Sequence, residues 1–127
     1  MERSYFVTML LLILHQIDAA FWREWEMFFL PGGVQGFLLF NAFAIPVLMI
    51  GYQHVLLGTS SARLYAKVCA GLGVLTFTIH VGLAISGSHQ FHLPLSIAVI
   101  VFCVISSTWL LVKARSVESR RTNSSAI

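Results

Sequence analysis

Residues able to do chemistry are concentrated in one short segment near the N-terminus. Residues 15–26 hold three of the five acidic residues in the chain and two of its three tryptophans. His15 and Asp18 begin this segment inside an apolar run, where an ionisable side chain is costly and usually persists because it binds, pairs or reacts. A helix completes a turn in about 3.6 residues, so these two side chains share one face. The pattern indicates a polar site inside a membrane-spanning helix.

The same face extends past the end of the first apolar run if the helix continues. Trp22 and Glu26 then follow on that face, whereas Glu24 falls on the opposite side. Glu26 would lie about 16 Å from His15 along a straight helix, so one ion reaches both only if the chain bends near Trp22. We expect Trp22 and Trp25 to anchor the segment at the membrane interface, with roofing of the polar site as the alternative.

A second polar face is expected in the third apolar run. Small or polar residues recur there at spacings of three or four: Gly73, Thr76, His80, Ala84 and Gly87. Small residues allow membrane helices to approach closely, so this face should pack inside a bundle with His80 near its centre. The same face could instead form the contact of a homo-oligomer.

Three of the polar residues should lie at a similar depth in the membrane. By the helix rise of about 1.5 Å per residue, His15, Asn41 and His80 each lie roughly 10–12 Å below the outer end of their own apolar run. Asp18 lies about one turn higher. The sequence therefore predicts a polar layer shared by three helices, with Asn41 in a supporting position.

Imidazole and carboxylate groups are ligands that zinc and iron commonly take in proteins. With His15, Asp18 and His80 as ligands, a divalent ion would keep one position open, as in catalytic rather than structural zinc sites. Such an ion can activate a bound water. Asp18 and Glu26 are then the expected acid–base residues, with Glu24 as a further partner near the mouth. Beyond a small or lipidic molecule, no substrate is predicted.

Three other roles remain open for the same residues. Without a metal, His15, Asp18 and His80 could form a proton relay or a transport site. Haem held between the two histidines is disfavoured, because Asp18 would stand beside it. Alternatively, the polar residues fix helix packing in a structural or accessory subunit that binds another membrane protein.

A second histidine pair, His89 and His92, follows the third apolar run. At the outer mouth of a bundle these rings could complete a metal site or line the access to it. Solvent-facing loop histidines also need no such role. The two residues are therefore supporting candidates.

Composition places the chain among integral membrane proteins. Of its 127 residues, 57% are hydrophobic and 10% are charged, whereas soluble domains carry roughly 25% charged residues. Four apolar runs approach or exceed the length of about 20 helical residues that crosses a bilayer. We predict an all-α, four-helix transmembrane bundle over residues 1–112, with spans at about 5–22, 34–57, 66–88 and 93–112. The basic, polar tail of residues 113–127 should be disordered.

Lysine and arginine positions predict the orientation. In a four-span arrangement only Arg23 lies on one side, and the other seven cations lie with the two termini and the loop between the second and third spans. Cytoplasmic loops carry the excess of such residues, so both termini should be cytoplasmic in the bacterial inner membrane. The lipid bilayer is the expected partner, and nucleic acid is not, because no soluble basic face exists.

The run from His15 to Phe28, followed by the residues Leu30-Pro31-Gly32-Gly33, resembles a family of small bacterial membrane proteins of unknown activity. It is also loosely similar to the HXXEE-domain family, whose first helix carries a His-x-x-Glu-Glu motif. Here His15 matches the histidine, Asp18 stands at the first Glu and Ala19 at the second. The resemblance implies a shared site in the first helix and no particular activity.

Overall fold

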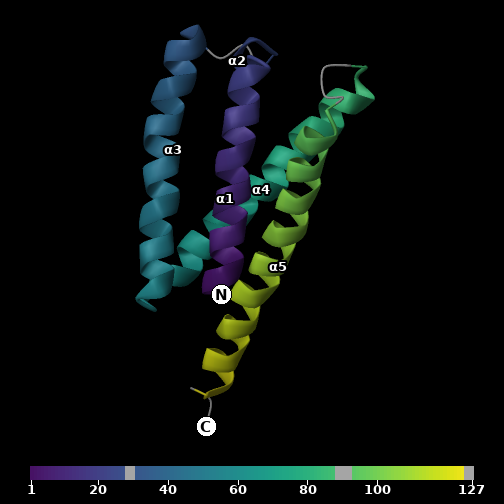
Figure 1. Ribbon diagram of the computed structural model, residues 1–127. Coiled ribbons are helices and arrows are strands. Elements are labelled where there is room, and N and C mark those ends of the chain that lie inside the picture. The colour runs from purple at the N-terminus through teal and green to yellow at the C-terminus, as the bar shows by residue number, and fades with distance from the viewer. Residues whose placement is uncertain (28–30, 88–92, 125–127) are drawn as a thin grey trace.

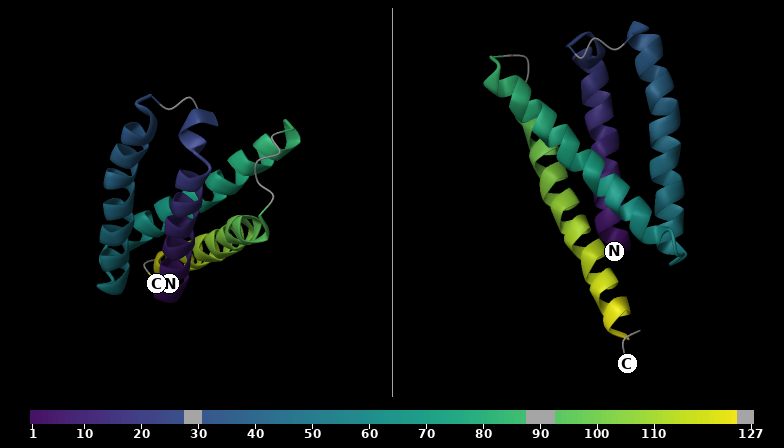
Figure 2. Two further views of the ribbon diagram at one scale, coloured as in Figure 1. Left: turned by 45° about the horizontal axis from the view of Figure 1, so that its top comes forward. Right: turned by 180° about the vertical axis from the view of Figure 1, so that it is seen from behind.

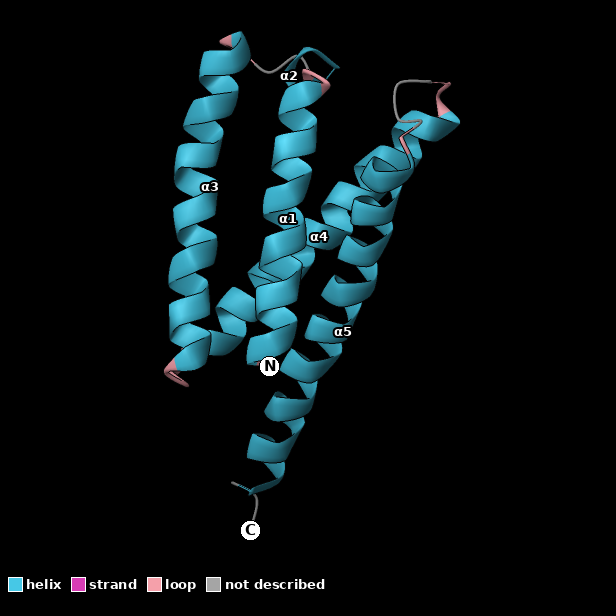
Figure 3. Ribbon diagram, in the orientation of Figure 1, coloured by secondary structure: helices cyan, strands magenta, loops and turns pink. Residues whose placement is uncertain are grey.

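The computed structural model describes residues 1–27, 31–87 and 93–124, and within them the chain is helical with short turns (Figure 3). Its helices are α1 (Glu2–Phe21), α2 (Glu24–Met27), α3 (Gly33–Leu56), α4 (Ala62–Ile85) and α5 (Pro94–Ser124). Four of these helices are long and apolar enough to cross a membrane. The prediction of an all-α chain with four helices of spanning length is confirmed.

Local sequence explains several helix ends. Pro94 is the first residue of α5, where its fixed φ suits a helix and its missing N–H is not needed. Gly32 precedes α3 with a φ of +89°, and Gly58 follows the same helix with a φ of +61°. This left-handed backbone favours glycine. Between such ends a helix is the conformation that satisfies every backbone polar group without water.

Helix α1 lies at the centre of the bundle and contacts α3, α4 and α5. Figures 1 and 2 show α3 on one side of α1 and α5 on the other, while α4 crosses behind α1 in the view of Figure 1. Helix α4 meets α3 at the turn between them and diverges from it toward the other end (Figure 2). Both termini and this turn lie at one end of the bundle, and α2 lies at the opposite end (Figure 1).

Close helix packing at the end that carries the termini forms the core. The fully buried Tyr5 donates its hydroxyl proton to the backbone oxygen of Leu48 in α3, at 3.0 Å. A side chain at Gly51 would collide with the Tyr5 hydroxyl, and one at Gly73 would collide with Ser107 of α5. Such small residues let membrane helices approach closely. This packing fixes which faces of α1 and α4 turn inward.

Apolar side chains cover most of the outer surface. Only 11% of the apolar window of α3 is buried inside the protein, and large side chains such as Phe43 and Ile85 are exposed. In water a surface of this kind would drive association. It is the surface expected of helices that face lipid.

The predicted disorder of the tail is wrong as far as Ser124. Helix α5 continues past residue 112, where the span was expected to end, and ends at Ser124. Residues 113–124 contain neither glycine nor proline. Because elongating a helix costs far less than nucleating one, the apolar span can propagate into this polar segment.

Candidate metal centre

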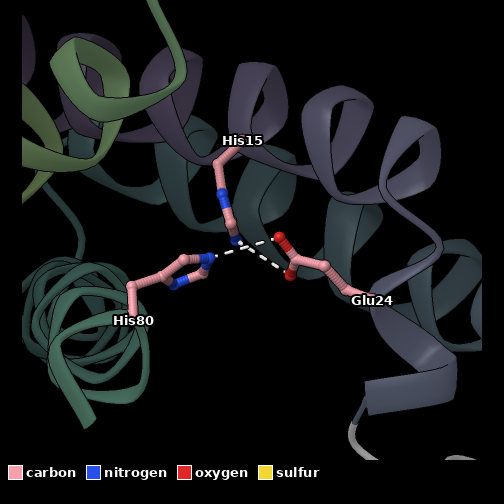
Figure 4. Close-up of side chains that lie close together, drawn as sticks. All are labelled: His15, Glu24 and His80. Atoms are coloured by element: carbon pink, nitrogen blue, oxygen red, sulfur yellow. Dashed lines mark hydrogen bonds and ion pairs between the residues drawn. The ribbon is translucent and has the colours of Figure 1, made fainter. Parts of the chain in front are cut away.

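Three ionisable side chains from three helices converge in the half of the bundle that carries α2 (Figure 4). His15 comes from α1, Glu24 from α2 and His80 from α4, and each is at least nine-tenths buried. Glu24 Oε1 lies 3.2 Å from His80 Nε2, and Glu24 Oε2 lies 3.9 Å from His15 Nε2. One ligand atom from each residue lies within 4.8 Å of the other two.

A reversal of the backbone brings Glu24 to this cluster. Helix α1 ends at Phe21, and Arg23 takes a φ of +53°, which is left-handed and uncommon for residues other than glycine. The N–H groups of Trp22 and Arg23 bond to the carbonyls of Asp18 and Ala20 and close the turn. The helix therefore does not continue through the aromatic segment, and the chain bends near Trp22.

The short helix α2 is held in place by Trp25. This ring is 8% exposed and packs on Phe37 of α3, with the two ring centroids 5.2 Å apart. Because Trp25 directly follows Glu24, this contact fixes the carboxylate over α1.

The protonation of His80 is constrained by its backbone contact. Its Nδ1 lies 2.8 Å from the carbonyl oxygen of Thr76. A carbonyl can only accept, so Nδ1 carries a proton and donates it. If the ring is neutral, the lone pair of Nε2 faces the Glu24 carboxylate. That contact is favourable only with a proton or a cation between the two groups.

The distances suit a small cation. Zinc binds nitrogen and oxygen ligands at about 2.0–2.2 Å, which separates the ligand atoms of a tetrahedral site by roughly 3.3 Å. The 3.2 Å contact of Glu24 with His80 is close to that value, whereas the 3.9 Å contact with His15 and the spread of up to 4.8 Å among the ligand atoms are wider. A bound ion would therefore draw the three side chains closer together. Metal-bound histidines usually donate their second N–H to a carbonyl or carboxylate, as His80 does to Thr76.

Asp18, predicted as a ligand, has a different partner. Its Oδ1 accepts a hydrogen bond of 2.7 Å from Ser96 of α5, and its Oδ2 has no hydrogen-bond partner among the described residues. The structure therefore brings together His15 and His80 as expected, and Glu24 takes the position predicted for Asp18.

Glu26 and Trp22 are not among the three converging side chains. Glu26 is exposed and forms an ion pair with the exposed Arg23, so it does not face the cluster. Trp22 is half-buried and packs edge-on against Phe21, with centroids 5.2 Å apart. His89 and His92 lie outside the described residues.

A cavity of about 210 Å³ adjoins the cluster. His15, Glu24 and His80 line it, together with Asn41 and apolar side chains of α1, α3 and α4. Asn41 is buried, as the predicted polar layer requires. The three ionisable residues therefore face an internal space large enough for a small molecule or for part of a larger one.

Glu24 is the residue that sequence reasoning placed on the wrong face. No glycine or proline, the residues that usually indicate a turn, lies between Asp18 and Glu26. Arg23 is also an unusual residue for a left-handed backbone conformation. The available signal was the crowding of polar and aromatic residues at the end of an apolar run. Such a segment belongs at the membrane interface, where a helix need not continue.

Comparison with known proteins gives a family and no activity. No curated protein and no solved structure matches the chain. Residues 1–117, which include all four helices of spanning length and the three converging side chains, match a family model described as a family of unknown function, DUF6713. The similarity to the HXXEE-domain family and the bacterial origin remain predictions. The chain belongs to the DUF6713 family.

Proposed function

We propose that the protein is a membrane-embedded divalent-metal protein in which His15, Glu24 and His80 hold zinc or iron. Two histidines and one carboxylate form the ligand set of several catalytic zinc sites and of non-haem iron oxygenases. Three protein ligands leave at least one position open. When bound, the ion would activate a water or dioxygen molecule in that position for reaction with a small or lipidic substrate.

The contact between Glu24 and His80 carries this proposal. A buried carboxylate 3.2 Å from an imidazole whose other nitrogen is already committed as a donor needs a positive centre between them. The remaining residues have supporting roles. Thr76 orients His80, and the packing of Trp25 on Phe37 holds α2, which carries Glu24, against α3.

A metal-free proton relay is the second candidate. The positive centre can also be a proton, because His80 Nε2 lies within hydrogen-bond distance of Glu24. Glu24 would then pass a proton between His80 and His15, whose Nε2 lies 3.9 Å from the other carboxylate oxygen. A structural or accessory role uses the same contact to tie α2 to α4. Haem is disfavoured because the two imidazoles touch edge to face, 4.8 Å between centroids, which leaves no space for a porphyrin.

Cobalt substitution tests the metal against these alternatives. Co²⁺ occupies zinc sites and absorbs visible light with a spectrum that depends on its ligands. We expect the purified protein to bind Co²⁺ with the bands of a four- or five-coordinate nitrogen–oxygen site, and zinc to displace it. Glu24→Gln, which keeps the shape of the side chain, should remove the bands. A spectrum identical to that of aqueous Co²⁺ would favour the proton relay or the structural role.

We also infer that the chain crosses the bacterial inner membrane with both termini in the cytoplasm, which puts the metal centre in the outer leaflet. The support is the placement of seven of the eight cations and the arrangement of both termini at the end away from α2 (Figure 1). Labelling of single-cysteine variants with an impermeant reagent checks this. Reaction of a Ser60→Cys variant in intact cells would contradict this orientation. A homo-oligomer or a membrane-protein partner is compatible with the apolar surface.

A further inference from the structure

The cavity beside the metal centre opens sideways toward the lipid. Phe40 of α3 and Leu75 and Ile79 of α4 line the cavity, yet their side chains are also exposed at the outer surface, by 50%, 53% and 37%. The mouth therefore lies between α3 and α4, where the two helices diverge (Figure 2). Both helices are apolar enough to span a membrane, so molecules reach this mouth through hydrocarbon and not through water.

One polar atom in the cavity wall has no partner. The Nδ2 of Asn41 donates to the carbonyl of Phe37 at 3.0 Å. Because that carbonyl only accepts, the amide orientation is fixed and Oδ1 is the free acceptor. Oδ1 has no hydrogen-bond partner among the described residues, although Asn41 is only 8% exposed. A buried acceptor without a donor is costly, so the site is suited to a ligand that donates a hydrogen bond.

The residues that line the cavity favour an uncharged ligand. Most residues that line the cavity are apolar, and among the described residues its wall contains no lysine or arginine. Its polar side chains are His15, Gln16, Glu24, Asn41, Thr76 and His80. Asn41 also lies about 12 Å along α3 from its first residue. In metal-free protein, a phosphate or carboxylate headgroup would meet no lysine or arginine here and would have to lose its hydration at this depth, which is costly. A neutral hydroxyl can enter to this depth, because a hydrogen bond to Asn41 Oδ1 replaces one of its hydrogen bonds to water.

The volume decides how much of the ligand enters. Pockets that enclose a whole drug-sized molecule measure about 300–1,000 Å³, and this cavity measures about 210 Å³. It can hold a hydroxyl and the first several carbons of a chain. The rest of a long chain would pass between α3 and α4 into the bilayer.

We propose that this cavity takes the hydroxyl end of a neutral single-chain lipid directly from the bilayer, with the hydroxyl donating to Asn41 Oδ1 beside the metal centre. As a statement about the substrate class, this rests on the function proposed above. The binding itself uses Asn41 and the apolar walls, so it is expected in metal-free protein as well.

A photoreactive long-chain primary alcohol tests the proposal in protein that has been reconstituted in lipid nanodiscs and treated with a chelator. We expect labelling of peptides from α3 and α4. Dodecan-1-ol should compete about tenfold better than its methyl ether, because the ether cannot donate to Asn41. Dodecyl phosphate should compete no better than the ether. Equal competition by the alcohol and the ether would overturn the proposal.

Two variants locate the binding. Asn41→Leu should remain labelled and lose the preference for the alcohol over the ether. Ala44→Phe, which fills the cavity, should lose labelling, whereas Ala42→Phe on the exposed face of the same helix should not. Unchanged labelling in a folded Ala44→Phe protein would contradict the proposal. If Ala44→Phe fails to fold, the competition series in Asn41→Leu carries the test alone. Since metal is absent throughout, failure here and failure of the metal centre are separate results.

Discussion

Glu24 and His80 are 56 residues apart in the chain, and their buried side chains lie 3.2 Å apart in the half of the bundle that carries α2. A neutral His80 ring cannot carry its single proton on Nε2, facing the carboxylate, because Nδ1 already donates a proton to the Thr76 carbonyl. The pair therefore holds an extra proton or an ion. His15 approaches the same carboxylate from α1, which makes a shared cation the arrangement that uses all three side chains.

Asp18→Asn should leave the metal content unchanged. The Asp18 carboxylate bonds to Ser96 and is not one of the three converging ligands. The change weakens a charge-assisted hydrogen bond between α1 and α5, which should lower stability by about 1–2 kcal/mol. Metal analysis and thermal unfolding of the purified variant measure the two effects. A folded Asp18→Asn protein without metal would return Asp18 to the ligand set.

Substitutions at Arg23 should separate backbone conformation from charge. Arg23→Gly accepts the φ of +53° without strain, so this variant should keep the metal centre. Arg23→Val adds a branched side chain to a left-handed position and should cost about 1–2 kcal/mol, with a measurable fall in metal affinity. The exposed ion pair with Glu26 is worth less than about 1 kcal/mol.

Glu26→Gln is the matched control for Arg23→Val. It removes the same ion pair and leaves the backbone turn intact, so its melting temperature and metal affinity should stay close to those of the parent protein. If Glu26→Gln and Arg23→Val behave alike, the left-handed turn is not what holds Glu24 in place.

Two neighbouring glycines of α4 should respond oppositely to alanine. A side chain at Gly73 would collide with Ser107 and lie 3.1 Å from the Cys103 sulfur, whereas one at Gly71 meets nothing within 4 Å. Gly73→Ala should lose about 1–3 kcal/mol by forcing α4 away from α5. Gly71→Ala should be neutral or gain up to about 1 kcal/mol of helix propensity. Thermal unfolding in one detergent compares them, and equal stability would contradict the close approach of α4 to α5.

Sequence reasoning reaches far into this fold because hydrocarbon allows few solutions. Long apolar runs must be helical, and the spacing of Gly73, Thr76 and His80 on one face predicts a buried histidine, which the structure contains. The shared depth of His15, Asn41 and His80 is reflected in the cavity that all three line. These features follow from helix geometry alone.

The carboxylate of the site depends on tertiary structure instead. A straight helix would place Glu26 above His15, but the chain turns at Arg23 and places Glu24 there. That turn is stabilised from outside the segment, by the packing of Trp25 on Phe37 of α3. Similarly, Ser96 of α5 donates a hydrogen bond to the Asp18 carboxylate. Local residue spacing does not encode contacts between distant helices. The segment alone therefore could not predict that Glu24, and not Asp18, joins the two histidines.

The most direct test is metal analysis of the detergent-purified protein by plasma mass spectrometry, after purification without chelators and after reconstitution with zinc or ferrous iron. We predict close to one ion per chain in the parent protein, and its loss in His15→Ala, Glu24→Gln and His80→Ala. Glu26→Gln and Asp18→Asn should retain it, as should His54→Ala, which removes an imidazole in the last turn of α3 that bonds to Thr59. Circular dichroism should show that all six variants are folded. Absence of metal from the reconstituted parent protein, or retention by folded Glu24→Gln, would contradict a metal centre built on these three residues.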